Sequence, residues 1–129
     1  MSDSEKFKLI ADNYRTTLSA RVGIDLEFNR TGVEYIEGYI KRVRDHLTEE
    51  NKDSLSVSVS CFIGESLKSF YEAGEWKYFD SIGSWGVSFG EKGAVFPFSR
   101  VMLILSGSDE PGLLEMFDSV LMMFSEEEE

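Results

Sequence analysis

Residues 54–98 decide the fold, and they read SLSVSVSCFIGESLKSFYEAGEWKYFDSIGSWGVSFGEKGAVFPF. Over residues 54–60 apolar side chains alternate with serines, which is the period of a strand. The same apolar positions continue as a broad helical stripe made of Leu55, Val59, Phe62, Ile63, Leu67 and Phe70. A stripe of that length favours a helix. We therefore predict a helix that begins at Ser54 and ends near Gly74.

Short aromatic strands are expected directly after this helix. Trp76 and Tyr78 alternate with Lys77, and a second alternating run comprises Trp85, Val87 and Phe89. This pattern is typical of two strands joined around residues 81–83. A glycine-rich turn at residues 90–93 then leads into a third short strand at residues 94–96.

Amphipathic helices are expected on the N-terminal side of this stretch. Residues 4–21 carry Phe7, Ile10, Tyr14 and Leu18 at helical spacing, and Gly23 stands where a helix commonly ends. A second helix carries Val33, Ile36, Ile40, Val43 and Leu47 on one stripe. Its predicted start is Thr31, since Thr31 and Glu34 have the spacing of a capping box.

The segments next to the second helix are less regular. Ile24–Phe28 alternates apolar and polar residues, which indicates either a short strand or an extended connector. Residues 48–53 are polar and predict a loop.

The C-terminal part predicts two more helices. Pro97 suits the first turn of a helix that runs to about Leu105, and residues 106–108 break it. Asp109 is the expected cap of the last helix, with Pro111 just inside it. The apolar stripe of that helix consists of Leu113, Phe117, Val120, Leu121 and Phe124. We thus predict a single α+β domain over residues 1–125, with four to five helices packed around a three-stranded or four-stranded antiparallel sheet, followed by an acidic tail at residues 126–129.

The net charge of the protein limits the classes of molecule that it can bind. The net charge is −11, from 24 acidic and 13 basic residues, so most of the surface repels a phosphate backbone or an anionic membrane. Nucleic acid is therefore disfavoured as a partner. A local basic patch at Lys41, Arg42 and Arg44 is the one place left open for such binding. The start lacks a secretion signal, and no apolar run approaches the ~20 residues that span a bilayer. We expect a cytoplasmic protein.

Several short motifs occur in an order that resembles a bacterial domain family of unknown function. The order is Leu26-Glu27-Phe28, an amphipathic helix from Val33, Ile63-Gly64-Glu65, Gly74-Glu75-Trp76, and Phe96-Pro97-Phe98-Ser99-Arg100. Members often have two glycines before the Trp, where this chain has Gly74-Glu75. The resemblance covers roughly residues 26–124. It implies a fold and carries no catalytic residue with it.

Catalytic chemistry finds little support. Cys61 is the only cysteine and lies on an apolar stripe, so we interpret it as a core residue rather than as a nucleophile served by His46. No phosphate loop, dinucleotide fingerprint or serine-hydrolase motif is present. We expect no catalytic residue, no metal site and no cofactor, and we favour a protein that is not an enzyme.

Two sets of residues are candidate sites. Glu65 is an acid on a mostly apolar helix; with Trp76 and Arg100 it would line a cleft between the sheet and the helices, or it would form an ion pair with Arg100 or Lys68. Glu34 and Glu37 are a candidate acidic face for a basic partner. The leading hypothesis is a non-enzymatic protein-binding, inhibitor, immunity or regulatory module. The alternative is a small-molecule-binding protein or small enzyme that uses the cleft. The oligomeric state is left open.

Overall fold

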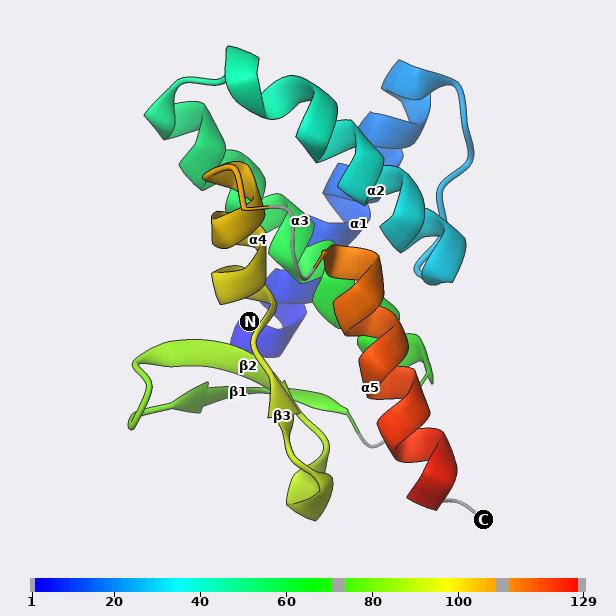
Figure 1. Cartoon of the computed structure of the whole chain (residues 1–129), viewed down its shortest axis with the longest axis vertical. Helices are drawn as coiled ribbons and strands as arrows, with labels where there is room; N and C mark the ends of the chain where they lie inside the picture. Colours follow the sequence, from blue (N-terminus) through cyan, green and yellow to red (C-terminus); the bar gives the residue numbers. More distant parts are fainter. Residues whose placement is uncertain (1, 71–73, 109–111, 128–129) are drawn as a thin grey trace.

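The computed structural model describes residues 2–70, 74–108 and 112–127, apart from the side chains of residues 124–127. The described chain forms a single α+β domain, as predicted (Figure 1). Its elements are α1 (Asp3–Val22), α2 (Arg30–Val43), the 3₁₀ turn η1 (Arg44–His46), α3 (Glu49–Phe70), β1 (Glu75–Phe79), β2 (Ser84–Ser88), the 3₁₀ turn η2 (Gly90–Lys92), β3 (Ala94–Val95), α4 (Pro97–Leu105) and α5 (Leu113–Glu127).

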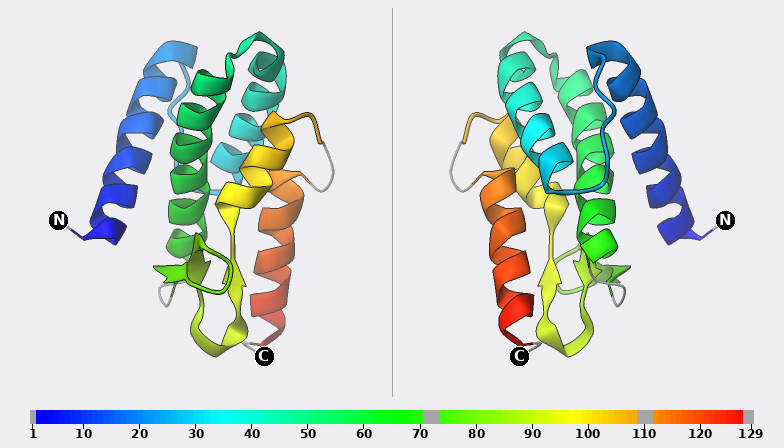
Figure 2. Two further views of the ribbon diagram at one scale, coloured as in Figure 1. Left: turned by 90° about the vertical axis from the view of Figure 1, so that its left-hand side faces the viewer. Right: turned by 90° about the vertical axis from the view of Figure 1, so that its right-hand side faces the viewer.

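Helix α3 is the centre of the molecule. It lies between α1 on one side and α2, α4 and α5 on the other, with the sheet at one end of the helices (Figure 2). All nine residues from Val59 to Leu67 are buried, including Ser60 and Ser66. A helix that buries every face in this way must be surrounded by other elements.

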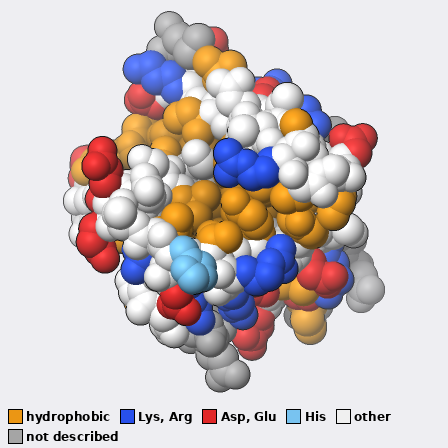
Figure 3. All heavy atoms as spheres, turned by 90° about the horizontal axis from the view of Figure 1, so that it is seen from above, with side chains coloured by type: hydrophobic (Ala, Val, Ile, Leu, Met, Phe, Trp, Pro, Cys, Tyr) orange, Lys and Arg blue, Asp and Glu red, His pale blue; other side chains and the backbone are white. Residues whose placement is uncertain are grey.

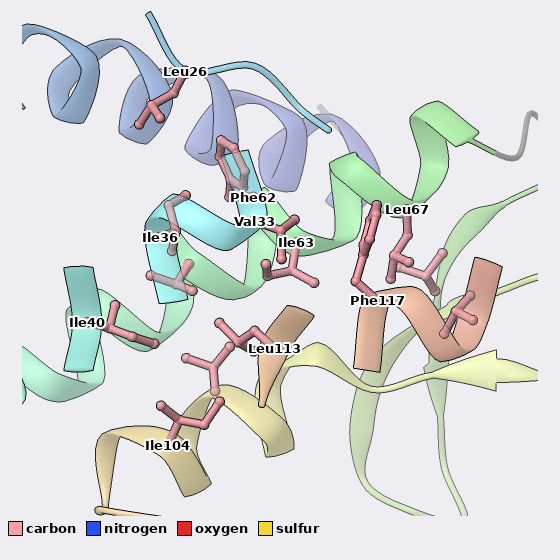
Figure 4. Close-up of a cluster of buried hydrophobic side chains, with 14 of the residues drawn as sticks. Leu26, Val33, Ile36, Ile40, Phe62, Ile63, Leu67, Ile104, Leu113 and Phe117 are labelled. Atoms are coloured by element: carbon pink, nitrogen blue, oxygen red, sulfur yellow. The ribbon is translucent and has the colours of Figure 1, made fainter. Parts of the chain in front are cut away.

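The core is built where three helices meet α3. Figure 4 shows side chains of α2, α4 and α5 converging on those of α3, and the labelled ones include Ile36, Ile63, Ile104, Leu113 and Phe117. Val33, Ile36 and Ile40 of α2 are completely buried, which confirms the predicted stripe of the second helix. Val43 and Leu47 at the end of that stripe are only half-buried.

Residues 24–28 form the extended connector and not the strand. The Leu26 amide donates to Ser19 Oγ at 3.0 Å, and the Leu26 carbonyl accepts from Arg15 Nη1 at 3.4 Å. Side chains of α1 therefore take the hydrogen bonds that a strand would give to a sheet. The connector passes so close to α2 that a Cβ at Gly32 would overlap the carbonyl oxygen of Glu27.

Two helix starts differ from the sequence predictions. The cap of α2 is Asn29, whose side chain accepts from the Gly32 amide at 2.9 Å, so Thr31 lies inside the helix. Thr48 accepts from the Asn51 amide at 3.1 Å and starts α3, so the predicted loop at residues 48–53 is wrong beyond Thr48. The first turns of α3 project beyond the core, and polar residues there leave no apolar stripe in the sequence.

The sheet follows the predicted order. Strands pair antiparallel as β1–β2–β3, with Trp76 opposite Val87 and Tyr78 opposite Trp85. Phe7 of α1 packs against Trp76 and Trp85 at ring-centroid distances of 4.8 and 5.1 Å. The N-terminal half of α1 thus packs on the face of the sheet that carries the tryptophans.

The predicted cap Asp109, together with Pro111, lies outside the described residues, as do residues 71–73 near the predicted end of the central helix. Helix α4 has the predicted bounds, with Pro97 in its first turn. Helix α5 continues to Glu127 and so takes in Glu126 and Glu127.

Candidate functional site

Glu65 and Trp76 are in contact, as expected for two residues that were predicted to line the same cleft. Both are buried, however, so they do not line an open cleft. The Glu65 carboxylate is 9% exposed, and its Oε2 accepts from Trp76 Nε1 at 2.9 Å and from Lys68 Nζ at 3.3 Å. The indole lies so close to α3 that a Cβ at Gly64 would overlap it. We call these four residues the Glu65 joint. Its acid is paired within the chain, as a buried carboxylate must be, and it connects α3 to β1.

Arg100 is not part of this joint. It lies on α4, where its side chain is half-buried and its Nε is fully buried without a hydrogen-bond partner among the described residues. Among the described residues, no carboxylate forms an ion pair with Arg100. The ion pair of Glu65 is the one with Lys68, which was the other predicted partner.

Arg100 instead lines an open groove of about 490 Å³ between α4, α5 and the edge of the sheet. The groove, called here the α4–α5 groove, is lined by Ile82, Ala94, Val95, Phe96, Ser99, Arg100, Leu103, Glu115, Met116, Ser119, Val120 and Met123. Most of this lining is apolar. In Figure 1, α4 lies above β3 and α5 runs down beside it.

The α4 wall is fixed by the core and by the sheet. Val101 and Ile104 are buried on the opposite face of α4, and the Ile104 carbonyl accepts from Arg44 Nη1 at 2.9 Å. Before α4, the Phe96 ring covers Gly86 of β2 so closely that a Cβ there would lie 2.9 Å from the ring. Glycine at position 86 thus lets Phe96 form the floor of the groove beside β3.

The α5 wall is held by α2. Glu37 accepts from the Leu113 amide in the first turn of α5, and Lys41 lies 3.9 Å from the same carboxylate oxygen. Further along, Arg30 donates from Nε and Nη2 to Asp118 at 2.9 and 3.0 Å, and this bidentate bond raises the pKa of Arg30. Together these contacts set the position of α5 relative to α2.

The two acids of the candidate acidic face, Glu34 and Glu37, therefore have different roles. Glu37 is only 16% exposed, because its carboxylate caps α5. Glu34 is 62% exposed and lies 3.7 Å from Arg30. Of the two acids, Glu34 is the one that a partner can reach.

The groove exposes large apolar side chains beside a few polar groups. Ile82, Leu103 and Met123 are 57%, 47% and 57% exposed along it, which is unusual for large apolar side chains that lie together. The polar groups are few: Arg100, Glu115 and two serines. Arg100 is the cation among them, and its guanidinium can pair with an anionic group held in the groove.

Cys61 is completely buried on α3, as predicted for a core residue. Burial raises the pKa of its thiol to about 12, and the negative charge of Glu65 adds to the effect. His46 is exposed in η1, and no hydrogen bond joins it to Cys61 in the described part of the chain. A neutral, enclosed thiol is a poor nucleophile.

The end of the molecule opposite the sheet has a different surface. Figure 3 shows apolar side chains in its centre with Lys and Arg side chains around them, and His46 nearby. A hollow of about 430 Å³ there is lined by Arg21, Tyr39, Val43, Leu47, Asn51, Ser54, Leu55 and Ser58.

The predicted basic patch lies near this end, but its three cations have contacts within the chain. Lys41 pairs with Glu37, and Arg42 lies 5.8 Å from the centre of the Tyr35 ring. Arg44 donates to the Ile104 carbonyl.

Sequence reasoning found Arg100 but missed the apolar groove residues. The available signal was the run of five apolar residues at 101–105 in α4. A helix on the surface can bury only one face, so part of that run had to stay exposed. Met102 and Leu103 are the exposed residues of the run.

Two further findings concern the described residues only. They contain no group of three or more His, Cys, Asp or Glu side chains placed to hold a metal ion. None of their helices has the length and hydropathy needed to cross a bilayer.

Comparison with known proteins yields no relative. No family model matches the chain, and neither a curated protein nor a solved structure matches it. The resemblance to a bacterial domain family stays a prediction.

Proposed function

We propose that this protein is a non-enzymatic binding protein and that the α4–α5 groove holds an apolar small molecule. The observation that carries the proposal is the groove itself, which combines exposed apolar side chains with one cation, Arg100, that forms no ion pair with the described residues. Small-molecule sites are typically mostly apolar hollows of ~300–1,000 Å³ with a few polar groups that orient the ligand. The groove has that size and composition.

The polar groups of the groove support binding rather than catalysis. Ser119 Oγ donates to the Glu115 carbonyl at 2.9 Å, so its hydroxyl is engaged with its own helix. A nucleophilic serine needs a base within hydrogen-bond reach, and no histidine lines the groove. The buried acid Glu65 and the buried thiol of Cys61 both lie outside it.

Nile red, an uncharged dye that fluoresces in apolar sites, tests this proposal. The folded wild-type protein should enhance its fluorescence. Leu103→Asp should abolish most of that enhancement, because Leu103 is exposed in the groove. Leu9→Asp is the matched control, since Leu9 on α1 is similarly exposed at 48% and lies outside the groove. Equal binding by the two variants would exclude the groove as the site.

A second candidate function is an acidic inhibitor, immunity or regulatory protein that covers a basic protein surface. The net charge of −11 and the exposed Glu34 favour it, because opposite charge accelerates encounter between proteins. Association with such a partner should weaken from low to physiological salt, as screening shortens the reach of surface charge to about 8–10 Å.

A charge reversal separates this function from groove binding. Glu34→Lys should slow association with a basic partner, whereas Leu103→Asp adds a negative charge and should not. A partner whose binding ignores both salt and Glu34→Lys would contradict the electrostatic function.

A further inference from the structure

We propose that the ligand of the α4–α5 groove is an amphipathic carboxylate, and that Arg100 binds its head group. This inference rests on the proposed function and adds the chemical class of the ligand. Arg100 is the one cationic side chain among the described residues that line the groove. Its Nε donates to no acceptor among the described residues, and none of their carboxylates pairs with it.

The geometry of a guanidinium favours a carboxylate over other acceptors. Its planar fork of N–H donors matches the two oxygens of a carboxylate, and such charge-assisted pairs are stronger than neutral hydrogen bonds. An alcohol or an amide offers a single neutral acceptor. A ligand with a carboxylate is therefore the best match for the guanidinium of Arg100.

The other polar groups argue for a single negative charge. Glu115 also lines the groove, from α5, and it is exposed. Its carboxylate repels a second anionic group, and the protein as a whole carries a net charge of −11. A phosphate dianion would meet one cation and one opposing acid, whereas a monovalent carboxylate needs only Arg100.

The rest of the ligand must be apolar. Ile82, Leu103 and Met123 are exposed along the groove from three different elements, and Val95 and Phe96 lie between them. An aliphatic chain or ring system covers these side chains and removes them from water. Methionine side chains such as Met116 and Met123 adapt to irregular apolar shapes, so the groove suits a flexible chain.

The test compares three ligands with the same chain and different head groups. Dodecanoate, dodecanol and dodecyltrimethylammonium, each below its micelle concentration, compete with Nile red for the wild-type protein. Dodecanoate should bind about tenfold to a hundredfold more tightly than dodecanol, which is the range that one charge-assisted pair supplies. The ammonium compound should not share this advantage.

Two variants assign the effect to Arg100. Arg100→Met should abolish the advantage of dodecanoate and leave the affinity for dodecanol unchanged. Glu115→Gln, the control on the opposite wall, should keep the advantage or increase it. A cooperative thermal unfolding transition establishes that each variant is folded. The comparison of head groups uses the wild-type protein, so it does not depend on whether a variant folds.

The outcomes separate the two proposals. If dodecanol and dodecanoate compete equally well, the carboxylate inference is overturned and groove binding stands. Retention of the dodecanoate advantage in folded Arg100→Met would overturn the role of Arg100. If no compound competes and Leu103→Asp still binds Nile red, both proposals fail.

Discussion

Glu65 and Arg100 are two charged side chains with buried polar atoms, and they differ in what surrounds them. Glu65 is almost fully buried and receives hydrogen bonds from Trp76 and Lys68. Arg100 has a buried Nε with no acceptor, although its side chain reaches an open groove. Buried polar groups that hold a fold are normally satisfied by the chain itself. The difference supports a structural role for Glu65 and is consistent with the binding role that we propose for Arg100.

The largest effect should come from crowding the Glu65 joint. Gly64→Ala would place a Cβ inside the Trp76 ring, so the indole must move and its bond to Glu65 must lengthen. Overpacking of this kind costs typically ~1–3 kcal/mol or more, and we expect the upper end of that range in chemical denaturation. Gly38→Ala is the control, since a Cβ there meets only Arg42 Nη1 at 3.4 Å. It should be neutral or stabilising.

Removing the acid of the joint should cost less. Glu65→Ala leaves Trp76 Nε1 buried without an acceptor, which lowers the free energy of unfolding by about 1–3 kcal/mol. Glu65→Gln should cost less than Glu65→Ala, because the amide oxygen still accepts from the indole. Urea denaturation measures both. If the two variants were equally stable, the hydrogen bond to Trp76 would not be what the acid contributes.

Cys61 lies one helical turn before Glu65, and its thiol makes the free energy of unfolding depend on pH. Its pKa is about 12 in the folded protein, against 9.0 for an ordinary thiol, so folding favours the protonated form. That stability is fully present below pH 9 and is lost as pH rises toward 12. Relative to Cys61→Ala, the wild type should therefore lose about 1 kcal/mol between pH 8 and pH 10. Parallel stability profiles for the two proteins would contradict the shifted pKa.

Helix α2 provides a matched pair of acids beside the start of α5. Glu37→Ala removes the acceptor for the Leu113 amide and should cost about 0.5–2 kcal/mol, as the loss of a helix cap does. Glu34→Ala, three residues away on the same helix, breaks only an exposed pair with Arg30 and should change stability little. Thermal unfolding distinguishes them. Similar values for the two would mean that Glu37 does not anchor the α5 wall of the groove.

Much of the fold could be predicted because it is set by local periodicity. The stripe of Val33, Ile36 and Ile40, the paired aromatic strands and Pro97 at the start of α4 all depend on residues close in sequence. The start of α2 could not be predicted, since Asn29 and Thr31 are both good caps and only the path of the connector decides between them. The role of Glu37 depends on α5, 76 residues away.

The site was predictable only in part. Arg100 and Glu65 were both recognisable as charges next to apolar residues, but their separation depends on where α3 and α4 cross. The two charged groups differ because Trp76 and Lys68 donate hydrogen bonds to Glu65. No local pattern in the sequence encodes an open groove, because it is a space left between elements rather than a property of one.

Arg100→Met should have the smallest effect on stability and is the sharpest test of the comparison. Removing a buried donor that has no partner eliminates its desolvation cost, while the Met side chain keeps most of the packing of the Arg stem. We expect the free energy of unfolding without ligand to stay within about 0.5 kcal/mol of wild type or to rise slightly. Denaturation with and without dodecanoate is the measurement. Wild type should gain stability from the ligand by mass action and Arg100→Met should gain much less. A loss of 2 kcal/mol or more without ligand would mean that Arg100 holds the fold as Glu65 does, and the contrast between the two residues would disappear.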